Sequence, residues 1–434
     1  MITIAIYRLL FLPAFLCAML FHYLWRMRKR GGYGKDFKFR LGLFKRLPKR
    51  KFGKRRLWIQ AVSVGEVKAL DKLMALLANA GTYEVVLTTT SSTGYELARK
   101  LYGDRALFIG LFPFDFWPFS WLAWNKIFPH VAILMENEIW PEHVWQAHRR
   151  NVPVVIVNAR ISDKTFNRYE LLRGLADPIL EKISHVIASD QISADRCASI
   201  GIPSDRIRIA GNMKFDCKIP QLEDERKLEL KKSLGFRAND MILLGSSTWE
   251  GEEKMLLRAL GKCKELDGRW KLLLVPRHSE RRNDVIGILQ AASVKWHQRS
   301  KGSASSTVDV CLVDTTGELQ MLTSIADLAF IGKSLKPNVG GQSPLDAACN
   351  GIPIVYGDGM ANFRDICASL ERSKCVIRVN SSERAIAAIC ALAKDEKKRE
   401  SLAKSLVEWH KNNCGASEFV FQKIHEIAFA GEKR

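Results

Sequence analysis

The sequence lacks the short motifs that identify many nucleotide-binding and metal enzymes. Neither G-x-x-x-x-G-K-[ST] nor G-x-G-x-x-G occurs, so a P-loop or an NAD site has no support. No Asp-x-Asp pair is present, which argues against a metal-held sugar nucleotide. The ten cysteines include no C-x-x-C pair and the nine histidines show no metal-ligand spacing. A zinc site and a disulfide framework therefore also lack support.

Positive charge is abundant in only one part of the chain. The stretch from Arg26 to Arg56 holds fifteen Lys or Arg residues and one acid, Asp36, which accounts for +14 of the net +21. The remainder is only mildly basic, and a nucleic-acid partner is therefore not predicted. A clustered basic strip instead favours anionic lipid head groups.

An apolar run precedes this basic strip and predicts a membrane anchor over residues 1–30. Leu9–Trp25 is almost unbroken apolar sequence, and no small-residue cleavage site follows it. Two forms fit: a spanning helix, or an amphipathic segment in the inner leaflet with Arg8 snorkelling. Both place the rest of the chain in the cytosol. The segment Lys35–Phe44 mixes aromatic and basic residues and is predicted to face the membrane, with a solvated charge run as the alternative.

Apolar strands then alternate with amphipathic helices, which predicts an α/β fold with two doubly wound parallel sheets. The charged stretch Pro220–Lys232 reads as a linker between them, and Glu383–Lys433 reads as helical. Two such domains in tandem would face each other across a cleft. The predicted boundaries are an anchor at 1–30, a first domain at 31–218, a linker at 219–235 and a second domain at 236–434.

The turn Ser63-Val64-Gly65-Glu66 is the first candidate site. It follows the apolar strand that begins at Leu57 and precedes a helix-spaced stretch, Val67–Leu77. Open α/β sheets bind ligands at the carboxyl ends of their strands. A carboxylate at the positive end of a helix is held ionised unless burial opposes it, which suits a general base. A simple first-turn charge that complements the helix dipole remains the alternative.

A glycine pair, Gly340-Gly341, gives the second candidate. It precedes Ser343-Pro344-Leu345-Asp346, a helix start with proline near the first turn that suits a phosphate. Asp346 is placed to bind ribose hydroxyls, as an acid does in dinucleotide sites. An ordinary tight turn is the alternative.

Eight motifs in register resemble the 3-deoxy-D-manno-octulosonic acid (Kdo) transferases of lipid A biosynthesis. The resemblance implies a GT-B glycosyltransferase on the cytoplasmic face of the bacterial inner membrane that moves Kdo from CMP-Kdo to a lipid A precursor, with inversion and without a cofactor. We also expect no divalent metal, because CMP carries a single phosphate and the sequence has no Asp-x-Asp pair and no His/Cys cluster. The motifs are Ser63–Glu66, Met135–Pro141, Asn158–Arg160, Lys214–Asp216, Ser247–Glu253, Pro276–His278, Gly317–Leu319 and Gly340–Asp346.

The same resemblance implies roles for individual residues. Glu66 would be the general base, and Glu136 and Lys214 would assist the transition state. The CMP site would be lined by Pro276, Arg277, Thr316, Gly317, Glu318, Ser343, Pro344, Leu345 and Asp346. The chain departs from the family at Gln342-Ser343, where His-Asn is usual, at Asp346, where Glu is usual, and at Trp249, where His is usual.

Two other classes of protein share part of this pattern. A different GT-B enzyme, such as a sugar-nucleotide epimerase, would have twin sheets but no need of a membrane anchor. A membrane-tethered binding module would keep the basic strip but would need no carboxylate at a strand end.

Overall fold

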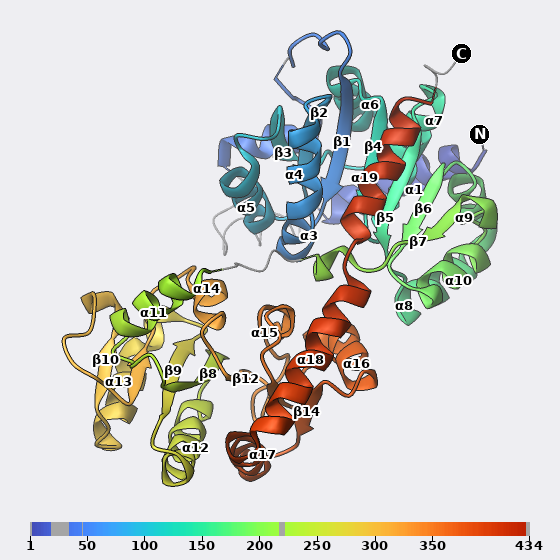
Figure 1. Cartoon of the computed structure of the whole chain (residues 1–434). Helices are drawn as coiled ribbons and strands as arrows, with labels where there is room; N and C mark the ends of the chain where they lie inside the picture. Colours follow the sequence, from blue (N-terminus) through green and yellow to red (C-terminus); the bar gives the residue numbers. More distant parts are fainter. Residues whose placement is uncertain (1, 19–33, 46, 217–221, 431–434) are drawn as a thin grey trace. The chain divides into compact units, whose positions relative to one another are not determined.

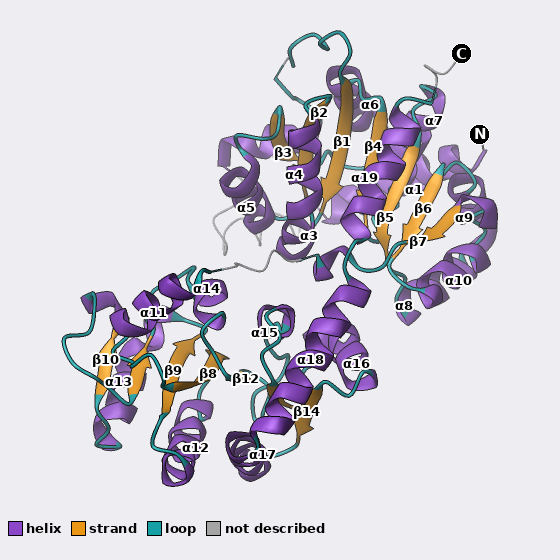
Figure 2. Ribbon diagram, viewed as in Figure 1, coloured by secondary structure: helices purple, strands orange, loops and turns teal. Residues whose placement is uncertain are grey.

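The computed structural model describes residues 2–18, 34–45, 47–216 and 222–430. It divides into two compact units (Figure 1), each an α/β layer structure with a parallel sheet (Figure 2). The first unit comprises the chain up to Asp216 together with the C-terminal segment from Asn413. The second comprises Cys217–Asn412. The predicted class of two Rossmann-like units is therefore confirmed.

The first sheet has the order β3-β2-β1-β4-β5-β6-β7, with every neighbouring pair parallel. The strands are β1 (Arg55–Ala61), β2 (Tyr83–Thr89), β3 (Phe108–Leu111), β4 (Val131–Met135), β5 (Val154–Ala159), β6 (His185–Ala188) and β7 (Ile207–Ile209). The direction of growth reverses between β1 and β4. Ligands of open α/β sheets bind at such a switch point, outside the carboxyl ends of the strands.

Helices cover both faces of this sheet. They are α1 (Ile2–Ala18), η2 (Gly34–Leu41), α3 (Val64–Ala69), α4 (Asp71–Ala80), α5 (Ser92–Tyr102), α6 (Trp117–Ile127), α7 (Pro141–Arg149), α8 (Asp163–Leu171), α9 (Arg173–Leu180), α10 (Gln191–Ser199), η3 (Ser204–Arg206), η4 (Met213–Phe215) and α19 (Ala416–Ala428). Successive residues of β1 enter opposite cores: Trp58 packs in the core with α6 and α7, and Ile59 packs with α4 and α19. Burial on both faces explains why the strands are almost continuously apolar.

The second sheet has the order β10-β11-β9-β8-β12-β13-β14, again parallel throughout, with its switch point between β8 and β12. The strands are β8 (Met241–Thr248), β9 (Trp270–Pro276), β10 (Trp296–Gln298), β11 (Val310–Leu312), β12 (Leu328–Ile331), β13 (Ile354–Gly357) and β14 (Val376–Val379). The helices are α11 (Asp224–Ser233), α12 (Glu252–Leu266), η5 (Ser279–Arg281), α13 (Arg282–Ala291), η6 (Arg299–Lys301), α14 (Leu319–Thr323), α15 (Leu345–Cys349), η7 (Ala361–Phe363), α16 (Arg364–Arg372), α17 (Ser382–Lys394) and α18 (Glu396–Asn413).

The stretch that we predicted as a linker, 219–235, contains a helix of the second unit. Residues 217–221 lie outside the described residues, and α11 follows them. Leu230 on this helix is buried, as are Leu234 and Phe236 just after it. These three apolar side chains dock a helix whose other positions are mostly charged.

The C-terminal helix α19 belongs to the first unit, whereas we predicted it in the second domain at 236–434. Val420 and Ile424 are fully buried in the core that α4 also lines. Asp216, the last residue before the chain enters the second unit, accepts the backbone N–H groups of Gly415 (2.6 Å) and Ser417 (2.5 Å). The Asp216 carboxylate therefore links the segment at which the chain leaves the first unit to the segment at which it returns.

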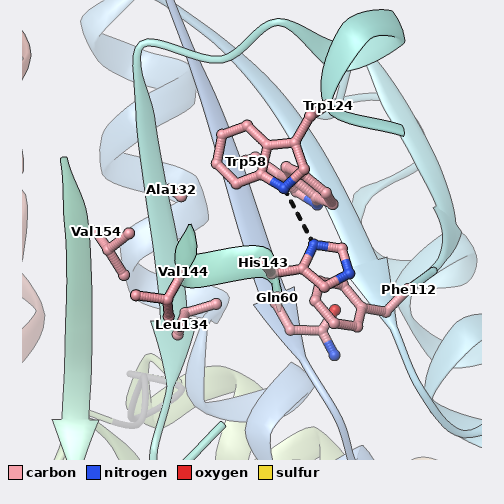
Figure 3. Close-up of a pocket in the computed structure, with 9 residues that line it drawn as sticks. All are labelled: Trp58, Gln60, Phe112, Trp124, Ala132, Leu134, His143, Val144 and Val154. Carbon is pink, nitrogen blue, oxygen red and sulfur yellow. Dashed lines mark hydrogen bonds between the residues drawn. The ribbon is translucent and has the colours of Figure 1, made fainter. Parts of the chain in front are cut away.

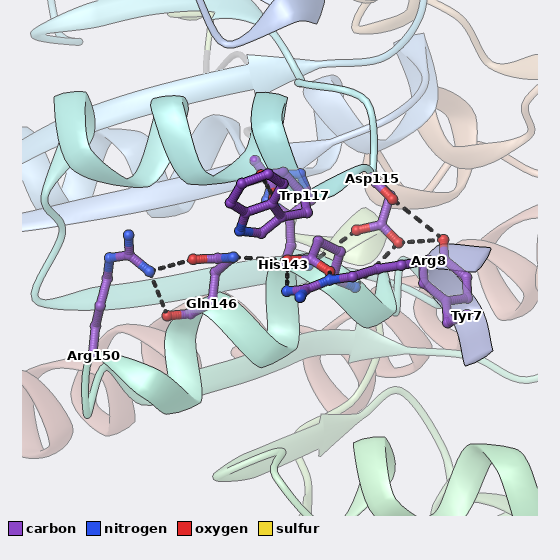
Figure 4. Close-up of polar contacts among 9 residues, drawn as sticks. Tyr7, Arg8, Asp115, Trp117, His143, Gln146 and Arg150 are labelled. Carbon is purple, nitrogen blue, oxygen red and sulfur yellow. Dashed lines mark hydrogen bonds and ion pairs between the residues drawn. The ribbon is translucent and has the colours of Figure 1, made fainter. Parts of the chain in front are cut away.

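The N-terminal helix α1 is attached to the first unit by buried polar groups (Figure 4). Tyr7 Oη donates to Asp115 Oδ2 at 2.6 Å, and Asp115 also accepts backbone N–H groups at the start of α7. Arg8 Nε and Nη2 each donate to Glu142 at 2.8 Å. The predicted snorkelling of Arg8 is therefore wrong, because its guanidinium pairs with a carboxylate that has no solvent exposure.

The rest of the predicted anchor, from residue 19 to residue 30, lies outside the described residues. Within the ranges that the structure covers, no helix combines the length and apolar character needed to span a membrane.

The segment Lys35–Phe44 is largely internal rather than membrane-facing. Phe39 and Phe44 are buried and pack against Phe108, with ring centroids 5.3 and 5.5 Å away. Arg40 is buried and donates to the backbone carbonyl oxygens of Phe112 (2.9 Å) and Thr90 (2.6 Å). The aromatic and basic residues alternate because the segment covers one edge of the first sheet.

We expect Asp216→Ala to loosen α19 without unfolding the sheets. Hydrogen bonds to a charged acceptor contribute about 1.5–3 kcal/mol each, and this change removes two. Hydrogen exchange at the α19 amides should then speed up roughly tenfold or more. Asp395→Ala is the control, because Asp395 accepts the Lys398 N–H at the start of α18 in the second unit. Unchanged exchange in α19 of Asp216→Ala would contradict the structural role of this carboxylate.

Candidate active site

Glu66 lies in the first turn of α3, directly after β1. Its Oε2 accepts the Val62 backbone N–H at 2.8 Å, and its Oε1 accepts the Ser63 hydroxyl at 2.8 Å. The Ser63 Oγ in turn accepts the Glu66 N–H at 3.3 Å and caps the helix. This reciprocal arrangement resembles a capping box, whose S-x-x-E spacing is visible in the sequence. The helix start thus fixes the carboxylate at the switch point of the first sheet.

Burial changes the acidity of this carboxyl. Glu66 is only 6% exposed, and burial raises its pKa above the ordinary value, although hydrogen bonds from Val62 and Ser63 act to lower it. The neighbouring Glu136 raises the pKa further and Lys214 lowers it. Burial therefore outweighs the favourable helix end. A carboxylate with a raised pKa is a better proton acceptor near neutral pH.

Glu136 and Lys214 form an ion pair beside Glu66. Glu136 follows β4 and Lys214 lies in η4, and their Oε1 and Nζ atoms are 2.6 Å apart. Glu136 has a φ of 55°, and Asn158, whose side chain accepts the Met213 N–H, has a φ of 54°. Positive φ costs energy in residues other than glycine and is found often at functional sites. The structure therefore brings the three predicted catalytic residues to one place.

Glu138 is a fourth charged residue of this cluster, and no role was predicted for it. Burial, together with the charges of Glu66 and Glu136, raises the pKa of its carboxyl to about 7. In the sequence, the only sign that Glu138 belongs to this cluster is its place in the same turn as Glu136. The burial that makes it unusual depends on tertiary packing.

The predicted donor-binding residues lie at the carboxyl edge of the second sheet. Pro276 is the last residue of β9, and Arg277 follows it. The Arg277 backbone N–H donates to the Thr248 carbonyl oxygen of β8 at 3.1 Å, and the Arg277 side chain is exposed. Thr316, Gly317 and Glu318 follow β11, the next strand beyond β9. Since the strands are parallel, these segments share one edge of the sheet.

Glu318 is already engaged by neighbouring side chains. Its Oε1 accepts Arg299 Nη2 at 3.1 Å, and its Oε2 accepts the Thr315 hydroxyl. Burial would raise the pKa of this carboxyl, but the hydrogen bonds from Thr315 and Arg299 outweigh it and hold the pKa below the ordinary value. Glu318 is therefore an ionised acceptor with a fixed orientation.

The glycine pair before α15 forms a tight loop that only glycine fits. Gly340 and Gly341 have φ values of 107° and 69°, and a Cβ on Gly341 would lie 2.5 Å from Met360 Sδ. Ser343, Pro344, Leu345 and Asp346 follow, and Ser343 Oγ accepts the Leu345 N–H at 3.3 Å. The predicted helix is present, but α15 has only five residues.

A separate cavity in the first unit is not part of this site. It is lined by Trp58, Phe112, Trp124 and His143 between the sheet and the helices α6 and α7 (Figure 3), and its volume of about 10 Å³ is at the lower limit for holding one water molecule. Burial lowers the pKa of His143 to about 3, and its Nδ1 accepts the Trp124 indole N–H at 3.2 Å. His143 is a neutral core residue.

Metal-binding geometry is not found in the described residues. No group of three or more His, Cys, Asp or Glu side chains among them is arranged to hold a metal ion. The metal-independent reaction therefore stays a prediction.

Comparisons with known proteins define the class and the family. The fold resembles that of a UDP-GlcNAc 2-epimerase from Neisseria meningitidis bound to UDP-GlcNAc, with a TM-score of 0.57 over 86% of this chain and 100% of that one; at 14% identity this likeness shows the fold alone. Two Rossmann-like units of this kind, with a buried carboxylate at one switch point, define a protein that resembles GT-B glycosyltransferases.

A family model described as 3-Deoxy-D-manno-octulosonic-acid transferase (kdotransferase) matches residues 35–217. A 3-deoxy-D-manno-octulosonic acid transferase from Haemophilus influenzae is 33% identical over 366 residues, covering 83% of this chain and 84% of the relative. One from Bordetella pertussis is 27% identical and covers 85% of this chain and 87% of the relative. The chain therefore belongs to the Kdo transferase family and is a glycosyltransferase, as its motifs predicted.

Ser63→Ala should move the acidic limb of the pH–rate profile to higher pH. The Ser63 hydroxyl stabilises the ionised form of Glu66, so removing the hydroxyl raises the pKa of the carboxyl further. A higher pH is then needed to ionise Glu66 so that it can act as a base. The profile of kcat/KM measures this shift. Ser162→Ala is the control, because Ser162 caps α8 in the same way but does not contact Glu66. An unshifted limb in Ser63→Ala would show that Glu66 does not control the profile.

Proposed function

We propose that this protein transfers Kdo from CMP-Kdo to a hydroxyl group of a lipid A precursor (lipid IVA), with inversion and with Glu66 as general base. One observation carries the proposal. The Glu66 carboxylate is buried at the switch point of the first sheet, next to the Glu136–Lys214 ion pair, in a chain of the Kdo transferase family. The alternative, a sugar-nucleotide epimerase, is supported only by the similarity of the fold.

In the proposed step, Glu66 accepts the proton of the acceptor hydroxyl as that oxygen bonds to the anomeric carbon of Kdo. The bond from this carbon to the phosphate oxygen breaks, and CMP leaves with the electron pair. The carboxylate can accept a proton because its two hydrogen bonds leave lone pairs available. Lys214, oriented by Glu136, supplies positive charge as the transition state forms.

The second unit is the proposed donor site. The exposed Arg277 guanidinium suits the phosphate of CMP, because its planar fork can donate two parallel hydrogen bonds. Asp346 is assigned to the ribose, and the remaining residues of the site are Pro276, Thr316, Gly317, Glu318, Ser343, Pro344 and Leu345. Because CMP carries a single phosphate, we further propose that these fixed charges replace a divalent metal.

A lipid acceptor requires the enzyme to reach a membrane, and the proposed location is the cytoplasmic face of the inner membrane. On α1, Leu9 and Leu10 are 76% and 60% exposed, and on α6, Trp117 and Trp121 are 46% and 44% exposed. Arg8 joins the two helices, with its guanidinium 5.9 Å from the centre of the Trp117 ring. This apolar surface, together with the exposed lysines at the end of the basic stretch, Lys45, Lys49 and Lys51, supports docking on anionic lipid.

Mass spectrometry of the products formed from CMP-Kdo and a tetra-acyl lipid A precursor tests the function. We expect the acceptor to gain Kdo and CMP to be released, with EDTA present throughout. An unmodified acceptor would contradict the transfer. Activity that EDTA abolishes and Mg²⁺ restores would contradict only the metal-independent mechanism, and conversion of UDP-GlcNAc by the same protein would favour an epimerase.

Glu66→Gln should reduce the rate of transfer by about 10²–10⁴, the usual contribution of general acid–base catalysis. The amide keeps the shape of the side chain but cannot accept the proton, so CMP binding should change little. Glu136→Gln is the informative comparison. It should lower kcat and also move the acidic limb to lower pH, because the charge of Glu136 raises the pKa of Glu66. Near wild-type transfer by Glu66→Gln would remove this residue from the mechanism.

The double variant Leu9→Asp/Leu10→Asp should bind anionic vesicles at least roughly tenfold more weakly than wild type, because each leucine contributes about 1.5–3 kcal/mol on burial. Co-sedimentation measures the binding, which should also weaken as salt rises. Leu266→Asp is the control, since Leu266 is a comparably exposed leucine at the end of α12 in the second unit. Equal loss in the control would show that α1 has no special part in docking.

A further inference from the structure

Two loops meet closely at the switch point of the second sheet. One consists of the end of β8, which contains Ser247, and the turn after it, which contains Trp249; the other follows β12 and contains Gly332 and Lys333. A Cβ on Gly332 would lie 2.3 Å from the Ser247 carbonyl oxygen, so the backbones approach as closely as glycine allows. The side chains of these loops therefore project from a place where ligands of such sheets bind.

A buried glutamate fixes both loops. Glu252 is 2% exposed, and its carboxylate accepts the backbone N–H groups of Trp249 (2.9 Å), Lys333 (2.8 Å) and Ser334 (3.0 Å). The Lys333 carbonyl oxygen in turn accepts the Gly341 N–H at 3.0 Å. Lys333 is thus held between Trp249 and the glycine loop that precedes Ser343.

The backbone of Lys333 is in a conformation that favours glycine. Its φ is 58°, and the facing Ser247 has a φ of 54°. Lysine costs stability here relative to glycine, because its Cβ is crowded in this region. Residues that keep such strain are concentrated at sites where the side chain has a function.

The Lys333 ammonium group lies over an aromatic surface. Its Nζ is 4.5 Å from the centre of the Trp249 ring. The ring of His278 also packs against Trp249, with 5.0 Å between the two ring centres. Both Lys333 and Trp249 are partly exposed. Among the residues that the structure describes, no carboxylate forms an ion pair with Lys333, so the charge is oriented by the tryptophan without being neutralised.

We propose that Lys333, held by Trp249, is a donor-binding residue that contacts an anionic group of the sugar nucleotide. The inference rests on the proposed function, which places the donor at this edge of the second sheet. Two groups of the donor have the required charge: the carboxylate of the sugar and the phosphate of the nucleotide. Both are oxyanions that an ammonium group binds by charge-assisted hydrogen bonds.

Lys333→Gly separates this role from a structural one, because it should change stability and binding in opposite directions. Glycine relieves the positive φ, so the unfolding temperature of the second unit should rise. Loss of the charge should raise the KM for CMP-Kdo roughly tenfold or more, the usual effect of losing a hydrogen bond to a charged group. Lys333→Arg keeps both the charge and the strain, and its KM should stay within a few-fold of wild type.

Lys374→Gly is the matched control. Lys374 is an exposed lysine of the same unit with a φ of 53°, and it follows α16. The same change should therefore raise the unfolding temperature there without altering the KM for the donor. A KM that is unchanged in Lys333→Gly, or equally raised in Lys374→Gly, would overturn the proposal.

Calorimetric titration with CMP identifies the anionic group. CMP carries the phosphate but not the sugar carboxylate, so weaker CMP binding by Lys333→Gly assigns the contact to the phosphate. Unchanged CMP binding with a raised KM for CMP-Kdo assigns it to the carboxylate. Wild-type protein that binds neither compound would refute the proposed function itself, whereas wild-type binding with no effect of Lys333→Gly would refute only this inference.

Discussion

The burial of the Glu66 carboxylate at the start of α3 is the constraint on which the proposed chemistry of the first unit depends. The Val62 N–H and the Ser63 hydroxyl hold its two oxygens at 2.8 Å, so the side chain cannot turn away from the carboxyl end of β1. Desolvation raises its pKa and the hydrogen bonds keep it ionisable. This balance gives a carboxylate that is oriented like a structural cap but retains the basicity that a proton acceptor needs.

A second buried glutamate occupies the corresponding place in the other sheet, with a different consequence. Glu252 also accepts backbone N–H groups beside a switch point, but it receives four from two loops. Burial raises the pKa of Glu252 as well, against these hydrogen bonds. Its acceptor capacity is used for structure, and the reactive or binding groups are the side chains that it positions. The same residue type thus serves chemistry in one unit and loop geometry in the other.

Hydrophobic patterning predicted most of the fold, because strands buried on both faces are continuously apolar. The apolar strand predicted from Leu57 is part of β1, whereas the three-residue β10 (Trp296–Gln298) has no apolar run that would reveal it. The placement of α19 could not be predicted, since its amphipathic pattern fits either unit and the contacts of Asp216 decide. For the site, motifs predicted the convergence of Glu66 with Glu136 and Lys214. They could not predict the raised pKa of Glu138, which depends on packing.

A direct titration of the Glu66 carboxyl tests the central claim. Carbon-13 NMR of protein labelled at glutamate side-chain carboxyls, with the resonance assigned by its loss in Glu66→Gln, reports this group without reference to activity. We expect a pKa above the value of about 4.3 that is usual for glutamate. A Glu66 carboxyl that titrates at or below that value would show that burial does not dominate, and would contradict the assignment of this residue as a tuned base.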